Sequence, residues 1–346
     1  YPNYISTIKG IMAIPDVLSI NQADLVLPAG SHTTLLKNSF VEIFTGYNLK
    51  AQTGSTLLLS KDSEIRTING GNIILETGSN LAVEGNSRII GNIQLADGAS
   101  INIAENSILN LQLGIVTIQP NTALKLGKNS KLVIENGTHF TIADGAVIEL
   151  AEGSEIVVMN KGEMTASGTN FSYYSDSGKW LGINALAGSS IKMDSINMYG
   201  ADTGIKGEGT YKFEVTNSVF EGCTNGIGLI GMQPGFDYSI TDNTLTGYDE
   251  GRGISITSSD GIFSRNNISH FNIGAYFIMS SPAVSKCEIT YNKYWGIVVS
   301  GQDAIPQLIN TEPLQVFGEL NNTIMKNGYV SNTDMFKSAQ IGINPY

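Results

Sequence analysis

Several charged residues between positions 242 and 260 are of types that could carry acid–base chemistry. Asp242, Asp249, Glu250 and Asp260 supply carboxylates, and Arg252 supplies a guanidinium group. Inverting glycoside hydrolases need two carboxyl groups about 6.5–9.5 Å apart, one as general acid and one as general base. The catalytic candidates of this chain are therefore Asp242, Asp249, Glu250 and Arg252, with Asp260 as a further carboxylate.

Aromatic residues follow this acidic segment and suggest a different chemistry, the binding of a sugar. An aromatic ring stacks on the apolar face of a pyranose while carboxylates and Arg bond its hydroxyls. We expect one acidic and aromatic ligand-binding surface, formed by Asp249, Glu250, Arg252, Tyr276, Tyr294 and Trp295. The alternative is that the rings cover a loop and the charges simply face water.

The composition indicates which elements must position these residues. The chain has 346 residues, of which 15% are charged and 39 are Gly. Ile, Val, Ser, Thr, Asn and Gly dominate over strong helix formers, which favours an all-β fold with short turns. A formal net charge of −11 opposes binding to nucleic acid or anionic lipid.

The chain shows no hydrophobic leader, no membrane span and no cysteine framework. No apolar run approaches the ~20 residues of a membrane span, so we expect no membrane insertion. The chain begins at Tyr1 without the hydrophobic region of a signal peptide, which indicates a mature or excised segment. Two Cys and three scattered His argue against a zinc site, so no metal site is predicted.

Internal repeats organise the sequence. In the first half a Gly-small-x-apolar-x-apolar unit recurs, as in Gly54–Leu59, Gly78–Val83 and Gly98–Ile103, with starts roughly 20 to 24 residues apart. In the second half one strand is repeated five times, and each copy precedes a second short strand that begins with Gly. The five copies are 191–196, 215–220, 240–245, 263–268 and 284–289. Because the whole turn repeats, stacked turns are favoured over a hairpin meander.

Stacking these copies in register predicts columns of like residues. The fourth position gives an inward polar column of Asp194, Ser218, Asn243, Asn266 and Cys287, and the sixth gives a core column of Ile196, Phe220, Leu245, Ile268 and Ile289. The third gives an outward charge ladder of Asn217, Asp242, Arg265 and Lys286. Two further outward columns are Asn225, Arg252, Ile273, Trp295 and Gly228, Ser255, Tyr276, Val298. Cys223 and Cys287 fall three turns apart, beyond disulfide reach, so both should be buried free thiols.

The Gly-Ile strand starts, the Asn ladder and the run Gly178–Ile183 resemble the right-handed parallel β-helix proteins related to pectate lyases. The Trp-x-Gly-Ile motif at Trp180 resembles β-helix domains of large secreted and cell-surface bacterial proteins. The resemblance implies a right-handed solenoid of about twelve turns. We expect an N-terminal cap or lead-in segment over 1–30, the β-helix over 31–310 and a C-terminal cap or tail over 311–346.

The enzymes among these similar proteins carry motifs that are incomplete here. The polygalacturonase-like pattern has Gly-His-Gly where this chain has Gly251-Arg252-Gly253, and no Asp-Asp pair is present. Polysaccharide lyases use a Lys or Arg base and commonly calcium, but the basic residues do not gather and the net charge repels a polyuronate. No cofactor is predicted, and calcium has no motif to support it.

The resemblance therefore implies a non-catalytic β-helix module, extracellular or on a bacterial cell surface, that serves as a structural stalk or in adhesion and binds a glycan. A polysaccharide lyase or inverting glycoside hydrolase acting on the face around Arg252 and Trp295 is the first alternative. A component that binds other cell-surface proteins within a larger assembly is the second. The expected partners are thus a polysaccharide, a cell-surface glycan or other cell-surface proteins.

Overall fold

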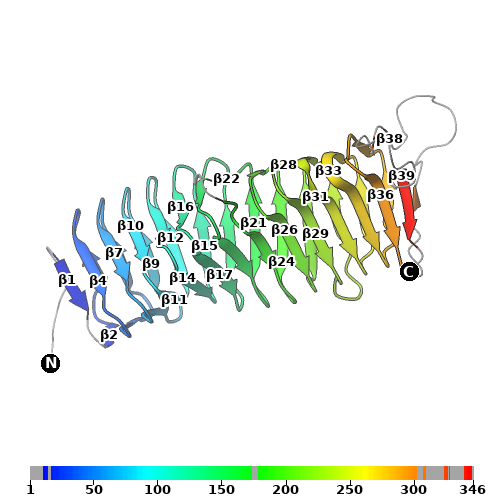
Figure 1. Ribbon diagram of the computed structural model, residues 1–346. Helices are drawn as coiled ribbons and strands as arrows, with labels where there is room; N and C mark the ends of the chain where they lie inside the picture. The colour runs from blue at the N-terminus through cyan, green and yellow to red at the C-terminus, as the bar shows by residue number, and fades with distance from the viewer. Residues whose placement is uncertain are drawn as a thin grey trace. The chain divides into compact units, whose positions relative to one another are not determined.

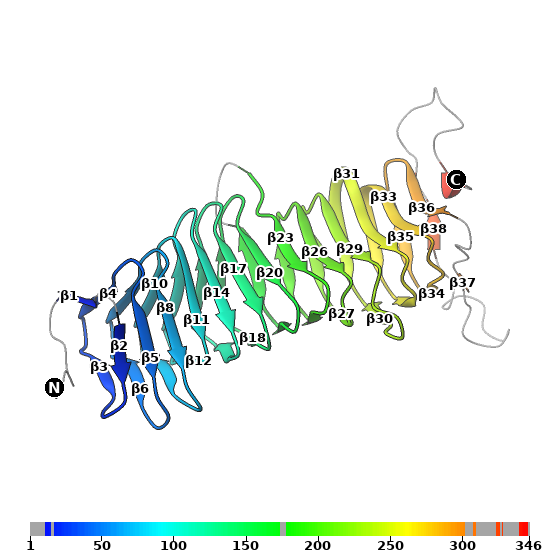
Figure 2. The ribbon, with the colours of Figure 1, turned by 90° about the horizontal axis from the view of Figure 1, so that it is seen from below.

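The structure is a computed structural model that describes residues 11–14, 17–173, 178–301, 307–308, 323–325, 327 and 339–344. Every regular element in these residues is a β-strand, and each strand pair described below is parallel. The chain forms two compact units, Tyr1–Trp180 and Leu181–Tyr346. Figures 1 and 2 show the strands of each unit stacked one turn after another.

Each turn of the first unit contributes one strand to each of three columns. The first column is β1 (Ile11–Ile14), β4 (His32–Leu35), β7 (Thr56–Leu59), β10 (Asn80–Val83), β13 (Ser100–Ile103), β16 (Ala123–Leu126), β19 (Val147–Leu150) and β22 (Asn170–Tyr173). The second is β2 (Val17–Ile20), β5 (Phe40–Ile43), β8 (Glu64–Thr67), β11 (Asn86–Ile90), β14 (Ile108–Gln112), β17 (Lys131–Glu135) and β20 (Glu155–Val158). The third is β3 (Leu25–Leu27), β6 (Asn48–Ala51), β9 (Asn72–Leu75), β12 (Asn92–Leu95), β15 (Ile115–Ile118), β18 (His139–Ile142) and β21 (Glu163–Ser167).

The second unit repeats this plan. One column is β24 (Ser190–Asp194), β27 (Lys212–Thr216), β30 (Tyr238–Thr241), β32 (Gly261–Ser264), β34 (Ala283–Ser285) and β37 (Gln307–Leu308). The next is β25 (Asn197–Tyr199), β28 (Val219–Glu221), the first parts of β31 (Thr244–Thr257) and β33 (Asn267–Ile278), β35 (Glu288–Thr290) and β38 (Thr323–Met325). The last is β23 (Gly182–Ala185), β26 (Thr203–Glu208), β29 (Asn225–Ile230), the second parts of β31 and β33, β36 (Trp295–Ser300) and β39 (Ala339–Asn344).

The core lies inside the turns and follows from the alternation of side chains along each strand. In β7, Leu57 and Leu59 are fully buried while Thr56 and Leu58 are half-buried, and Leu57 pairs with Leu81 of the next turn. Apolar side chains thus stack on apolar side chains from turn to turn. The prediction of an all-β parallel solenoid with about twelve turns is confirmed.

Stacked strands extend past both sequence-based boundaries. Ile11–Ile14 of β1 already pairs with β4, and β3 pairs with β6, so parallel stacking begins before residue 31. At the other end, β38 and β39 pair with β35 and β36, so stacking also continues after residue 310. The remaining residues predicted as caps, 1–10, 15–16, 309–322, 328–338 and 345–346 among them, lie outside the described residues.

The inward polar column predicted for the second unit is present, but its first member differs from the predicted one. Val215 pairs with Met193 and Phe220 with Met198, so the first copy of the repeat is Met193–Met198 and not 191–196. Asp194 consequently pairs with Thr216 and lies outside the column, where its expected place is taken by Ile196. The Ile196 N–H donates to Ser218 Oγ at 3.2 Å. Ile196 likewise leaves the core column that contains Phe220, Leu245, Ile268 and Ile289.

From Ser218 onward the amide ladder follows the prediction. Asn243 Oδ1 accepts from the Ser218 N–H at 3.0 Å, and Asn266 Oδ1 accepts from the Asn243 N–H at 3.1 Å. Cys287 ends the run, with its thiol donating to the Phe263 carbonyl. Cys287 and Cys223 are both buried free thiols, as predicted. Since the described residues contain no helix, none of them forms a helix able to cross a membrane.

Candidate functional site

The two predicted outward columns lie side by side on the face formed by β31, β33 and β36. Arg252 is in register with Ile273, and Ile273 with Trp295. Three residues further along the same strands, Ser255 is in register with Tyr276, and Tyr276 with Val298. Because successive turns of a parallel sheet stand about 4.8 Å apart, these side chains form one continuous surface across three turns.

Arg252 and Tyr276 are in direct contact on this face. The Arg252 guanidinium carbon lies over the Tyr276 ring, 4.4 Å from its centre. Arg252 is exposed, Tyr276 is half-buried, and the Arg252 backbone N–H is held by Asn225 Oδ1 at 3.2 Å. A guanidinium over a ring gains cation–π energy and keeps its edge donors available. Trp295 is half-buried in the Arg252 column, with Ile273 between them.

Asp249 lies in a bulge of β31, three residues before Arg252. The pairing of β31 with β33 shifts between Thr246 and Glu250, which places Gly247–Asp249 in a bulge. Asp249 has a positive φ of 59°, and its Oδ1 lies 3.9 Å from Nδ1 of His270. The His270 ring in turn stacks on Tyr291, with the ring centres 6.0 Å apart and the ring planes inclined by 11°.

The bulge also carries an exposed tyrosine. Tyr248 is 67% exposed and lies over Gly222, where an added Cβ would come within 2.8 Å of the ring. Neither Tyr248 nor the neighbouring pair His270 and Tyr291 was predicted from the sequence. His270 and Tyr291 continue the register of β33 with β35, in which Ser269 pairs with Thr290, whereas Tyr248 lies in the bulge of β31, which the repeat does not reveal.

The other predicted binding residues occupy the margin of the face. Glu250 is exposed, in register with Phe271 and two residues before Arg252 on β31. Tyr294 is 38% exposed just before β36, and the Lys293 ammonium nitrogen lies 5.4 Å from its ring centre. The structure therefore brings Arg252 and Tyr276 into contact and puts Trp295 on the same face, while Asp249 lies in the neighbouring bulge of β31.

Two carboxylates considered for catalysis have bonds of their own. Asp242 accepts two bonds from Arg265, at 2.5 and 2.6 Å, within the predicted outward charge ladder. These bonds hold the pKa of Asp242 below its usual range, so the group stays ionised at neutral pH. Asp260 Oδ1 accepts the Ser281 N–H at 2.9 Å and thereby joins two successive bends.

Potential metal ligands do not gather in the part of the chain that the structure describes. There, no group of three or more His, Cys, Asp or Glu side chains is arranged to hold a metal ion. The arrangement around Arg252 instead offers a cation–aromatic pair, an indole and neutral hydroxyl and amide groups. Such a surface is suited to binding.

Comparison with known proteins identifies the architecture of one part of the chain. Residues 203–343 match the family model described as a right handed beta helix region. Neither the curated proteins nor the solved structures contain a match to this sequence. The match covers β26 to β39 and gives the right-handed sense that the resemblance implied, while the bacterial cell-surface context stays a prediction.

Proposed function

Because residues 203–343 are a right-handed β-helix region, we propose that the chain is a non-catalytic module of a secreted or surface-exposed protein. It acts as a structural support in adhesion and binds a glycan on the face of β31, β33 and β36. This proposal includes the bacterial cell-surface location that the family resemblance suggested. Its ligand is a polysaccharide or a cell-surface glycan.

The contact of Arg252 with Tyr276 is the observation that carries this proposal. The Arg252 guanidinium carbon lies over the Tyr276 ring on an outward face, 4.4 Å from the ring centre. The guanidinium edge donates to sugar hydroxyls, and the indole of Trp295 two turns away supplies an apolar plane for a second sugar ring. Ser255 and Asn225 add neutral polar groups in register with these residues.

The state of the nearby carboxylates supports binding without catalysis. A glycosidase general acid needs a carboxyl group whose pKa is raised, so that it still holds a proton near neutral pH. Asp242 has the opposite shift because Arg265 bonds it. Asp249 Oδ1 lies 3.9 Å from Nδ1 of His270, a neighbouring side chain outside the Arg252–Tyr276 pair.

A glycan array probed with the purified chain tests this function. We expect a defined set of glycans to bind, and the change Tyr276→Ala to weaken that binding about tenfold, since it removes both a stacking plane and the support of Arg252. Tyr199→Ala is the matched control, because Tyr199 is a 38% exposed tyrosine on β25, in another column. Equal binding by both variants, or no glycan bound, would overturn the proposal and favour a protein partner.

A further inference from the structure

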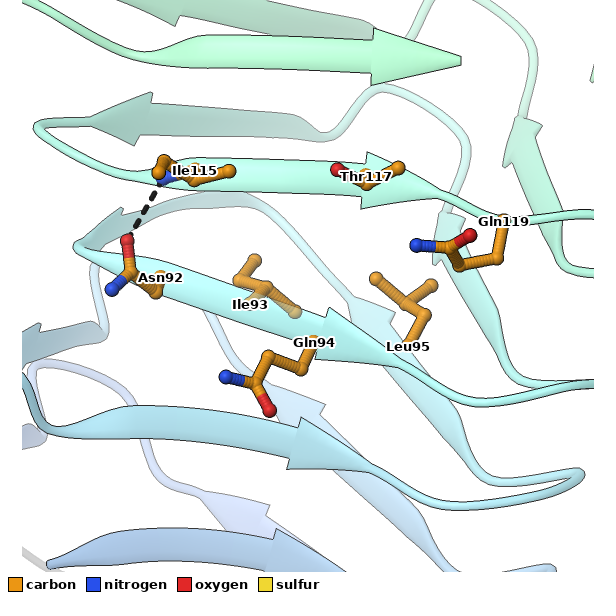
Figure 3. A pocket seen from close by; sticks show the side chains of 7 residues that line it. All are labelled: Asn92, Ile93, Gln94, Leu95, Ile115, Thr117 and Gln119. Atoms are coloured by element: carbon orange, nitrogen blue, oxygen red, sulfur yellow. Dashed lines mark hydrogen bonds between the residues drawn. The ribbon is translucent and has the colours of Figure 1, made fainter. Parts of the chain in front are cut away.

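A hollow opens in the first unit, between strands β12 and β15 (Figure 3). Its volume is about 410 Å³, within the range of small-molecule sites. Its lining consists only of neutral amide, hydroxyl and aliphatic side chains. The lining residues are Asn92, Ile93, Gln94, Leu95, Ile115, Thr117 and Gln119.

The hollow exists because β12 and β15 separate toward their ends. The strand pairs on either side, β9 with β12 and β15 with β18, are each in register at four positions. Strands β12 and β15 share one position, Ile93 with Val116. At the start of β15, the Ile115 N–H donates to the side chain of Asn92 at 2.9 Å, as the dashed line in Figure 3 shows.

One backbone hydrogen bond that neighbouring turns of this column form is missing between β12 and β15. The residue after each strand donates its N–H to the last carbonyl of the strand below, as Ala96 does to Leu75 at 2.8 Å and Ala143 does to Ile118 at 2.9 Å. Among the described residues, the corresponding bond from the Gln119 N–H to the Leu95 carbonyl is not formed. A donor and an acceptor therefore face the hollow at its far end.

A short turn precedes the place where the strands part. Asn72 of β9 lies 24 positions after Asn48 of β6 in the sequence, whereas Asn92 of β12 lies only 20 positions after Asn72. A single residue, Gly91, joins β11 to β12. β12 nonetheless stays in register with β9 at four positions. The next turn is longer again, with Ile115 placed 23 positions after Asn92, and it is β12 and β15 that share a single position.

Two residues before Ile115, Leu113 has a strained backbone conformation. Leu113 has a positive φ of 52° and is 60% exposed, as is Ile115 at the margin of the hollow. The bends between the same two columns use Gly70 and Gly91 in earlier turns and Asn136 in a later one. A bulky residue in this conformation costs roughly 1–2 kcal/mol, and an exposed apolar side chain offsets none of it.

We propose that this hollow binds one neutral, hydroxyl-rich ligand, a single sugar residue. Thr117 and the amides of Gln94 and Gln119 bond its hydroxyls, and the free Leu95 carbonyl and Gln119 N–H bond one more. Ile115 covers its C–H face. The ligand is neutral because no charged side chain lines the hollow to pair with a charge. The site is separate from the Arg252 face and does not depend on it.

Titration followed by backbone amide NMR on the full chain tests this site. The probes are neutral methyl hexosides, a neutral oligosaccharide of the same sugar, and the matching uronate and amino sugar. A neutral probe should saturate at millimolar concentration and shift the amides of Leu95, Gln119 and their neighbours. Tighter binding of the oligosaccharide identifies a residue within a chain as the ligand, and equal binding identifies a free monosaccharide; either result supports the proposal.

Substitutions separate this site from structural effects and from the face in the second unit. Thr117→Val keeps the shape of the side chain and should weaken binding at least about fivefold by removing one hydrogen bond. Gln94→Ala, at an exposed position that the fold tolerates, should do the same, and Tyr276→Ala should leave this titration unchanged. The absence of shifts around the hollow, preference for a charged sugar there, or unchanged affinity in both first-unit variants would overturn the proposal.

Discussion

Different side-chain hydrogen bonds hold the bends of the two units. In the first unit, bend hydroxyls mostly bond a carbonyl three residues earlier in their own turn, as Ser79 Oγ does to Glu76 O and Ser154 Oγ to Ala151 O, both at 2.7 Å. In the second unit, side chains at equivalent bends accept bonds from the backbone of the preceding turn, as Asn266 does from Asn243.

This difference changes what a single side chain stabilises. A hydroxyl that bonds its own turn is replaceable with a local loss, because the stacked backbone ladder keeps its partners. A ladder amide satisfies two turns at once, so its removal leaves buried donors and acceptors without partners. The second unit should therefore be the more sensitive of the two to change at its bends.

The largest expected effect is at Asn266. Asn266→Ala removes the acceptor of the Asn243 N–H and of the Asn243 amide and the donor to the Ile240 carbonyl. We expect a loss of about 3–4 kcal/mol in the free energy of unfolding, against about 1 kcal/mol for Ser79→Ala. Denaturant titration of both variants measures the difference. Similar losses at the two positions would remove the distinction between the units.

The reactivity of Cys287 tests whether the end of the same amide ladder stays closed in the folded protein. Burial raises the pKa of its thiol to about 11 from a usual value of 9.0. A thiol with this pKa is about 100-fold less ionised than an ordinary one, so alkylation of the native protein near pH 8 should be at least that much slower than in denaturant. Rate measurement with a thiol reagent, with a Cys223→Ser background to isolate the site, checks this. Rapid alkylation of the folded protein would show that the ladder opens there.

A substitution at Tyr238 should stabilise the protein, in contrast to Asn266→Ala. Its side chain is fully buried on β30, and among the described residues its hydroxyl has no hydrogen-bond partner, while burial raises its pKa. Tyr238→Phe removes an unsatisfied buried group and should increase the free energy of unfolding by about 1 kcal/mol. Tyr276→Phe, at a half-buried surface position, is the control. A decrease in stability would mean that the Tyr238 hydroxyl makes a bond in solution.

The smallest expected effect is that of the charge pair at Asp242. Since the bonds from Arg265 lower the folded-state pKa of Asp242, its contribution is present above the unfolded value near 3.8 and is lost as the pH falls through the lower folded value. Both side chains are substantially exposed, so Asp242→Asn should cost less than about 1 kcal/mol at neutral pH. This cost should fade below pH 3.8 and at high salt. A loss of stability that does not depend on pH would show that packing, and not the charge pair, causes it.

The sequence predicted the surface columns because the second strand of each repeat starts with Gly followed by an apolar residue, which fixes the alignment of Arg252 with Ile273 and Trp295. It misaligned Asp194 for a physical reason. A shift of two residues leaves the inward and outward faces of a strand unchanged, and Ile191 and Met193 are both apolar. Hydrophobic alternation therefore could not choose between them.

The sequence repeat could not predict the features that arise from irregular turns. The contact of Asp249 with His270 depends on the bulge in β31, and the hollow lies beside β12, the strand that follows a short turn. A repeat indicates what successive turns share, whereas these sites arise where one turn differs from its neighbours. The shorter interval from Asn72 to Asn92 was visible in the sequence, but the resulting separation of two strands was not.

The most direct test of the proposed function follows binding and chain length of one glycan in the same sample. The polysaccharide that binds best is incubated with the wild-type chain and with Tyr276→Ala, and its bound fraction and size distribution are measured together. We predict that the wild type binds it, that the variant binds about tenfold more weakly, and that no chain is shortened by either. Shortening of the polysaccharide that is abolished by Asp249→Ala or Glu250→Ala would contradict a non-catalytic module.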